Sequence, residues 1–182
     1  ENEADDLIGA YVTKFNENNI NANIGSNDFD FIQLVTDYTF LLRMYHGAVT
    51  KFDRETVINR FGISPDQYIE YLALKGDTSD NIKGIEGIGN KRAASLLCNF
   101  GDISNIYGLF NTLPRGLQKL LSDKEEYLNR QKEFLRINTN VPLRPSKQPH
   151  AYSYSAGLIP NKMGGFLNSN WDMIIDCAQK YR

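Results

Sequence analysis

Asp77 and Asp80 are the residues whose types and spacing point most directly to chemistry. They stand in the stretch Gly76-Asp77-Thr78-Ser79-Asp80-Asn81, directly after an apolar segment that predicts a helix. A spacing of three residues brings both carboxylates to one side of a turn or helix start, where two oxygen ligands can face one cation. The stretch therefore predicts a site for a hard divalent cation.

A glycine-rich segment follows at once, Gly84-Ile85-Glu86-Gly87-Ile88-Gly89-Asn90-Lys91-Arg92. Glycines let a backbone turn sharply and approach a ligand closely, and unpaired N–H groups at a helix start attract phosphate. Asn90 is expected to help cap the following helix, which leaves Lys91 and Arg92 near its start. The pattern is typical of a helix-hairpin-helix, which binds the DNA backbone without reading its sequence. A tight turn between helices that binds no ligand is the alternative.

Two other phosphate-binding motifs are excluded. A P-loop needs Gly-Lys-Ser/Thr at its end, whereas Gly89 is followed by Asn90 before Lys91. The dinucleotide fingerprint needs a glycine three residues after Gly89 and a strand before the motif, and neither is present. A carboxylate pair beside a phosphate-binding turn thus suggests metal-dependent chemistry on a phosphodiester.

The stretch LKGDTSDNIKGIEGIGNKRAASLL, residues 74–97, closely resembles the signature of the 5′-nucleases. This family includes the 5′→3′ exonuclease domain of bacterial DNA polymerase I, the phage flap endonucleases and small bacterial relatives. The resemblance runs from Glu3 to about Pro142 and covers only the later part of the family's nuclease domain. It implies a mostly helical α/β fold: part of a PIN-like parallel sheet, followed by a helical region that contains the helix-hairpin-helix (H3TH).

The resemblance also implies a metal site and a nuclease activity. In the family, the first cluster supplies two ligands and an adjoining acid, an Asp-x-Asp pair supplies two more, and the late pair completes the set. The implied catalytic and metal-binding residues are Glu3, Asp5, Asp6, Asp28, Asp30, Asp77 and Asp80. Oxygen ligands suit Mg²⁺ or Mn²⁺, and two such ions can activate water and hold the scissile phosphate. The acids are therefore expected to converge.

Each early acid cluster has a structural alternative. Acids at the chain start, before a helix expected over residues 7–15, also favour the positive end of a helix dipole. Asp28 and Asp30 follow an expected strand at residues 20–25 and are also placed to cap a helix. The rival function is accordingly a helix-hairpin-helix DNA-binding module without catalysis, in which the acids are structural.

By the same resemblance, the glycine-rich segment is expected to bind DNA with a 5′ flap, a nick or a branch. The implied DNA-binding residues are Gly84, Gly87, Ile88, Gly89, Lys91 and Arg92. A K⁺ ion at the hairpin is a further family expectation.

The distribution of charge along the chain supports separate metal-binding and DNA-binding segments better than the net charge does. The net charge of −2 does not indicate nucleic-acid binding. Residues 1–82, however, hold 6 Lys/Arg against 14 Asp/Glu, and residues 83–147 hold 11 against 6. The acidic excess coincides with the proposed metal ligands, and the basic excess with the proposed phosphate-binding segment.

Composition indicates an ordinary globular chain, with 41% hydrophobic and 23% charged residues. No apolar run approaches the ~20 residues of a membrane helix, and no signal-peptide pattern occurs. Cys98 and Cys177 are expected to be free thiols in a reducing cytoplasm, that of a bacterium or a phage-infected cell.

We expect three regions: 1–62 as the later part of the α/β nuclease core, 63–142 as the helical region, and 143–182 as an extension packed on the core. The chain lacks an initiator Met, and the family's early strands and basic arch are not found in it, so a fragment or processed product is expected. We predict that the chain binds DNA but cleaves it only when an upstream segment is supplied, in cis or in trans.

Overall fold

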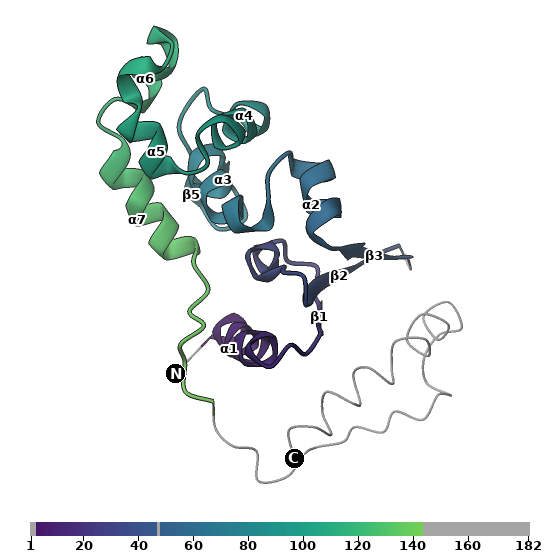
Figure 1. Cartoon of the computed structure of the whole chain (residues 1–182). Helices are drawn as coiled ribbons and strands as arrows, with labels where there is room; N and C mark the ends of the chain where they lie inside the picture. Colours follow the sequence, from purple (N-terminus) through teal and green to yellow (C-terminus); the bar gives the residue numbers. More distant parts are fainter. Residues whose placement is uncertain (1–2, 47, 144–182) are drawn as a thin grey trace, which may run out of the picture. The chain divides into compact units, whose positions relative to one another are not determined.

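A computed structural model describes residues 3–46 and 48–143 (Figure 1). The chain divides into unit 1, Glu1–Asp53 with Ile137–Arg182, and unit 2, Arg54–Arg136. Apart from residue 143, the expected C-terminal extension lies outside the described residues, as do Glu1, Gly47 and Cys177. None of the helices in the described part combines the length and apolar character that a membrane crossing requires.

Unit 1 carries a three-stranded sheet with the order β1-β2-β3. β1 pairs parallel with β2, and β2 pairs antiparallel with β3. The elements of unit 1 are α1 (Ala4–Glu17), β1 (Ala22–Gly25), the 3₁₀ helix η1 (Asp30–Leu34), β2 (Thr39–Tyr45) and β3 (Ala48–Phe52). The helix expected over residues 7–15 and the strand expected at residues 20–25 are confirmed as α1 and β1, and so is the mostly helical α/β class.

The core of unit 1 forms where α1 and η1 meet the sheet. Ile32 and Leu41 are fully buried, as is Thr39, whose hydroxyl donates a hydrogen bond to Asn16 Oδ1 (2.9 Å). Gly9 marks a close approach, because a Cβ there would lie 2.7 Å from the side chain of Ile137. The segment from Ile137 onward therefore packs against α1, although more than a hundred residues separate the two.

Unit 2 is a set of helices interrupted by one small hairpin. Its elements are α2 (Arg54–Phe61), η2 (Pro65–Gln67), α3 (Tyr68–Lys75), β4 (Gly76–Asp77), β5 (Ile82–Lys83), α4 (Asn90–Phe100), α5 (Ile103–Gly108), η3 (Phe110–Thr112), α6 (Arg115–Leu121) and α7 (Glu125–Leu135). Ser64 and Gln67 form a capping box at the start of η2.

α3 is the central helix of unit 2 and packs against α4 and α7. Leu72 and Leu74 are buried on it, and Gly76 ends it with a φ of 85°, a conformation that favours glycine. Glu70 of α3 accepts hydrogen bonds from the Ile103 N–H (2.6 Å) and from Lys132 of α7. α3 is thus held on several sides, which fixes the starting point of the hairpin that follows it.

Candidate metal and nucleic-acid sites

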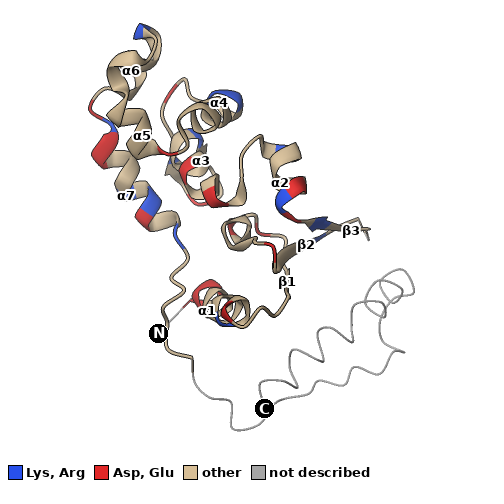
Figure 2. Ribbon diagram, in the orientation of Figure 1, with Lys and Arg blue, Asp and Glu red and all other residues tan. Residues whose placement is uncertain are grey.

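The first acid cluster lies at the start of α1 (Figure 2). Asp5 and Asp6 occupy the first helical turn, after Glu3 at the N-cap. Burial, and then the charges of Asp28, Glu3 and Asp6, raise the pKa of the Asp5 carboxyl above 3.8. Acids of the first two clusters therefore lie near enough to repel one another within unit 1.

Asp6 also has a structural contact. Its Oδ1 accepts a hydrogen bond from the Asn138 N–H (2.8 Å), so this carboxylate ties the returning segment to α1. The predicted adjoining acid therefore supports the fold of unit 1.

The second cluster lies in the acid loop (residues 26–30), which follows β1. Ser26 Oγ accepts from the Asp28 N–H (3.0 Å), and Asp28 Oδ1 accepts from the Asp30 N–H (2.9 Å). This bond closes an Asx turn just before η1; the N-cap of η1 is Phe29 and has no side-chain cap, so the helix-capping alternative is not confirmed for Asp28. Such a bond engages only part of the acceptor capacity of a carboxylate and leaves room for a second role.

Arg43 of β2 braces the acid loop. It donates two hydrogen bonds to the Asn27 carbonyl, from Nε (3.1 Å) and Nη2 (2.7 Å). Its guanidinium carbon lies 3.4 Å from the centroid of the Phe29 ring. Sequence reasoning missed this role, because the contact joins positions 16 residues apart and follows no motif spacing.

The third cluster lies in the acid hairpin (residues 76–83), where β4 and β5 pair antiparallel. Asp77 ends β4 and Asp80 lies in the turn that follows it, and one carboxylate oxygen of each lies within 4.8 Å of the other. Asp77 Oδ1 accepts from the Ser79 N–H (2.9 Å) and also from the Ser79 hydroxyl. The predicted turn geometry is confirmed.

The donor set fits a hard divalent cation. Every candidate ligand is a carboxylate oxygen, the Asp77–Asp80 pair needs little closure to share one ion, and the acids around Asp5 repel one another. A bound cation would offset that repulsion. The first two clusters belong to unit 1 and the third to unit 2, and the convergence of the early acids with Asp77 and Asp80 stays a prediction.

The glycine turn (residues 84–89) joins the acid hairpin to α4. Gly84 lies against the end of α3: a Cβ there would lie 2.2 Å from the Lys75 carbonyl carbon. The Ile88 N–H donates to the Ile85 carbonyl (2.9 Å), and Gly87 between them has a φ of 85°. The side chain of Ile88 is 2% exposed, so this predicted DNA-binding residue supports the turn from inside.

α4 begins with its cationic residues exposed (Figure 2). The expectation that Asn90 caps this helix is wrong: Gly89 is the N-cap, Asn90 is the first helical residue, and no side chain caps the start. A Cβ at Gly89 would meet nothing within 4 Å. The first N–H groups of α4 therefore face a position without side-chain cover, beside Lys91 and Arg92.

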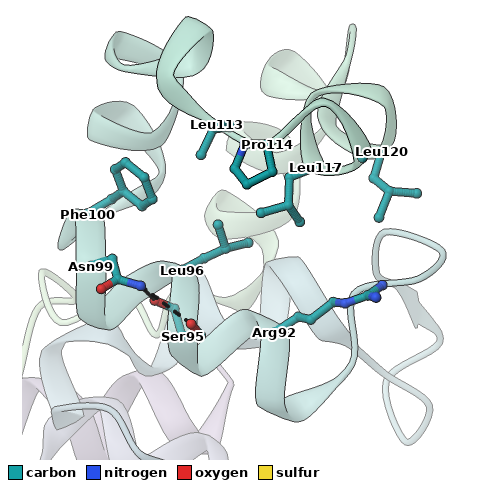
Figure 3. Close-up of a pocket in the computed structure, with 10 residues that line it drawn as sticks. Arg92, Ser95, Leu96, Asn99, Phe100, Leu113, Pro114, Leu117 and Leu120 are labelled. Carbon is teal, nitrogen blue, oxygen red and sulfur yellow. Dashed lines mark hydrogen bonds between the residues drawn. The ribbon is translucent and has the colours of Figure 1, made fainter.

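Arg92 has an internal contact as well. Its Nη1 donates to the Gly87 carbonyl (2.6 Å) and so ties α4 to the glycine turn. Arg92 also stands at the edge of a groove of about 630 Å³ between α4 and α6. Figure 3 shows Leu117 pointing from α6 toward Leu96 of α4. The groove is lined mainly by apolar side chains, with Arg92, Ser95 and Asn99 as its polar members, and a mainly apolar lining does not suit phosphate.

Comparison with known proteins gives matches along most of the chain. The family model of the 5′-3′ exonuclease N-terminal resolvase-like domain matches residues 1–62, and that of the 5′-3′ exonuclease C-terminal SAM fold matches residues 63–155. The chain is 40% identical over 144 residues to a 5′-3′ exonuclease of Mycoplasma genitalium, covering 78% of this chain and 50% of the relative. It is 35% identical over 142 residues to DNA polymerase I of Borreliella burgdorferi, covering 77% and 16% respectively.

Solved structures show the same fold. A zinc-bound T5 5′-exonuclease matches with a TM-score of 0.65 and 21% identity, over 98% of this chain and 58% of that one. The T5 D15 flap endonuclease with DNA and metal ions matches with a TM-score of 0.64 and the same coverage. The chain spans about half the length of the 5′-3′ exonuclease relative named above. With both family models matched in order, the chain belongs to the 5′-3′ exonuclease family.

Proposed function

We propose that this chain forms the later, metal-binding and DNA-binding part of a structure-specific 5′-nuclease that hydrolyses DNA phosphodiesters. One observation carries the proposal: the Asp77–Asp80 turn runs through β5 directly into the glycine turn, and both are anchored on α3. A carboxylate pair and a phosphate-binding turn are thereby held in a fixed relation within one unit. A DNA-binding module without catalysis has no need of that coupling.

The seven acids would hold two Mg²⁺ or Mn²⁺ ions. Asp77 and Asp80 are the pair that could share an ion in unit 2, and Glu3, Asp5, Asp6, Asp28 and Asp30 complete the proposed set. The bound ions would supply an activated water and stabilise the leaving oxygen. The T5 5′-exonuclease structure contains zinc, which supports a divalent-metal site without identifying the ion used by this chain.

The glycine turn would hold one strand of the duplex by its phosphates. The exposed start of α4 offers N–H groups, Lys91 offers a mobile charge, and Arg92 offers a guanidinium fixed to Gly87. Gly89 leaves space for the backbone of the DNA to approach. DNA with a 5′ flap, nick or branch is the proposed substrate class, with a K⁺ ion at the turn as a further family expectation.

We infer that unit 1 binds a further stretch of polypeptide, in cis or in trans. Among the described residues, β1 pairs with β2 alone and is an edge of the sheet. On α1, Leu7, Ile8 and Tyr11 are 37%, 36% and 42% exposed. An open parallel edge and an apolar helix face suit a partner that adds strands and buries side chains. The proposed regions remain 1–62, 63–142 and 143–182.

The test is a paired binding and cleavage assay with a 5′-flap duplex. The chain should bind the flap duplex in EDTA, and cleavage in Mg²⁺ should require the upstream part of the nuclease domain. In that complete nuclease, Asp77→Asn should lower turnover by more than about 100-fold while binding survives, because it removes a proposed ligand and preserves shape. Cleavage by the Asp77→Asn enzyme at the wild-type rate would contradict the proposal and favour the non-catalytic module.

A further inference from the structure

Lys75, the last residue of α3, places an ammonium group beside a proposed metal ligand. Its Nζ lies 3.9 Å from Asp77 Oδ2. The two side chains are only 20% and 21% exposed, so this pair is largely shielded from water. The attraction between the two charges is correspondingly stronger than in a pair at the open surface.

The position of the ammonium group does not depend on Asp77 alone. Nζ also donates a hydrogen bond to the Gly76 carbonyl (2.8 Å) and lies 5.6 Å from the centroid of the Tyr71 ring. Tyr71 is buried in α3, and Gly76 begins β4. The charge of Lys75 is therefore held at the junction between the central helix and the acid hairpin.

The two oxygens of Asp77 have different surroundings. Oδ1 accepts from the Ser79 N–H and hydroxyl, which keep it turned into the hairpin turn. Oδ2 faces Lys75. Within the acid hairpin, the carboxylate pair of Asp77 and Asp80 thus already has one cation at its edge, and that cation belongs to the chain.

We propose that Lys75 is a resident counter-ion of Asp77 that competes with the divalent cation for this site. The inference rests on the proposed metal-binding role of Asp77. In the absence of metal, Lys75 offsets the repulsion between Asp77 and Asp80; with metal present, it repels the incoming ion. Lys75 therefore raises the metal concentration needed to occupy the site at Asp77 and Asp80. While the site is empty, Lys75 stabilises the acid hairpin.

The test is a titration of the purified 182-residue chain with Mn²⁺, with free Mn²⁺ followed by electron paramagnetic resonance. Lys75→Met should tighten Mn²⁺ binding by about three- to tenfold, because it removes a positive charge close to the ion. Lys75→Arg, which keeps the charge, should bind like the wild type. Lys83→Met is the matched control: it removes an exposed lysine from the same hairpin and should leave affinity unchanged.

Thermal unfolding supplies a second readout, in which the size of the rise caused by Mn²⁺ separates competition with the metal from a purely structural role. In EDTA, Lys75→Met should unfold at a lower temperature than the wild type, because Asp77 loses its counter-ion. Saturating Mn²⁺ should raise the unfolding temperature of Lys75→Met by more than it raises that of the wild type. Lys75→Gln, which keeps a polar end, should show the same signs and serves if the Met variant folds poorly.

Three results would overturn the inference, and they are distinguishable. Unchanged or weaker Mn²⁺ binding by both neutral variants would mean that Lys75 does not compete with the metal. If Lys83→Met tightened Mn²⁺ binding as much as Lys75→Met does, the change in affinity would come from the net charge of the chain and not from the position of Lys75. If Asp77→Asn binds Mn²⁺ as tightly as the wild type, or the wild type binds none, the proposed metal role of Asp77 fails, and the inference fails with it.

Discussion

The acid loop of unit 1 and the acid hairpin of unit 2 hold similar side chains by different means. In both, an aspartate accepts a hydrogen bond from the N–H two residues later: Asp28 from Asp30, and Asp77 from Ser79. The acid loop then depends on Arg43 from a separate strand. The acid hairpin depends on Lys75 and Ser79, both within two residues of Asp77. Geometry that is built locally can be recognised in a sequence, whereas geometry built by distant contacts cannot.

The largest expected effect is on stability, and it comes from disrupting the locally built junction between α3 and the glycine turn. Gly84→Ala places a Cβ 2.2 Å from the carbonyl carbon of Lys75 and 2.3 Å from the Gly76 nitrogen. Backbone atoms cannot move aside as a flexible side chain can, so we expect a loss of at least about 3 kcal/mol in the free energy of unfolding. Urea denaturation measures it.

Gly89→Ala is the matched control for Gly84→Ala. A Cβ at Gly89 has open space, and its φ of −94° suits any residue, so stability should fall by less than about 1 kcal/mol. DNA affinity should nevertheless decrease, because the Cβ would occupy the proposed phosphate approach. If Gly89→Ala binds DNA normally, Gly89 is only a helix cap.

The next effect tests the contacts that Arg43 of β2 makes with the acid loop. Arg43→Met removes two hydrogen bonds and the contact with Phe29, and we expect about 1–2 kcal/mol of destabilisation together with weaker Mn²⁺ binding. Lys51→Met is the control, since Lys51 also lies over a ring, 3.6 Å from the centroid of Phe40, on the neighbouring strand. Weakened Mn²⁺ binding in both variants would show that general loosening of the sheet, not the acid loop, is responsible.

The glycine turn offers a smaller test, in DNA binding. Lys91→Ala and Arg92→Ala should each weaken binding about three- to tenfold, with little dependence on DNA sequence. Each should also reduce the slope of log K against log salt by about one unit. Arg92→Ala should lower the unfolding temperature as well, because it loses the bond to Gly87, whereas Lys91→Ala should not. Unaltered affinity and slope in both variants would leave the segment as a turn between helices.

The smallest effect concerns the charge of Asp5. Because burial, Asp28, Glu3 and Asp6 raise its pKa, the folded state binds this proton more tightly than the unfolded state does. The ionised carboxylate therefore lowers stability above its folded pKa, and this loss fades as the pH falls toward 3.8. In EDTA at neutral pH, Asp5→Asn should unfold at a higher temperature than the wild type.

Saturating Mg²⁺ should reverse that order, because the wild type then gains a ligand that the variant lacks. Thermal unfolding across pH, with and without Mg²⁺, checks both signs. A variant that is less stable in EDTA at every pH would contradict the repulsion between Asp5 and its neighbouring acids.

The sequence by itself determined the elements and the local devices. Helical spacing of apolar residues marked α1 and α3, and the order of acids, glycines and cations in residues 76–92 indicated both turns. These features depend on backbone propensity and on side chains within a few residues of each other, which the order of the chain specifies directly.

Only the tertiary structure decided which side chains meet across the chain. The charge of Asp28 raises the pKa of Asp5, the Asn138 N–H donates a hydrogen bond to Asp6, and Arg43 donates hydrogen bonds to the acid loop. No sequence motif predicts any of these three contacts. The structure also shows that the N-cap of α4 is Gly89 and not the expected Asn90. The extended conformation of the glycine turn ends at Gly89, so Asn90 is already helical. Such contacts are set by how the elements pack against one another, which residue spacing within a segment does not specify.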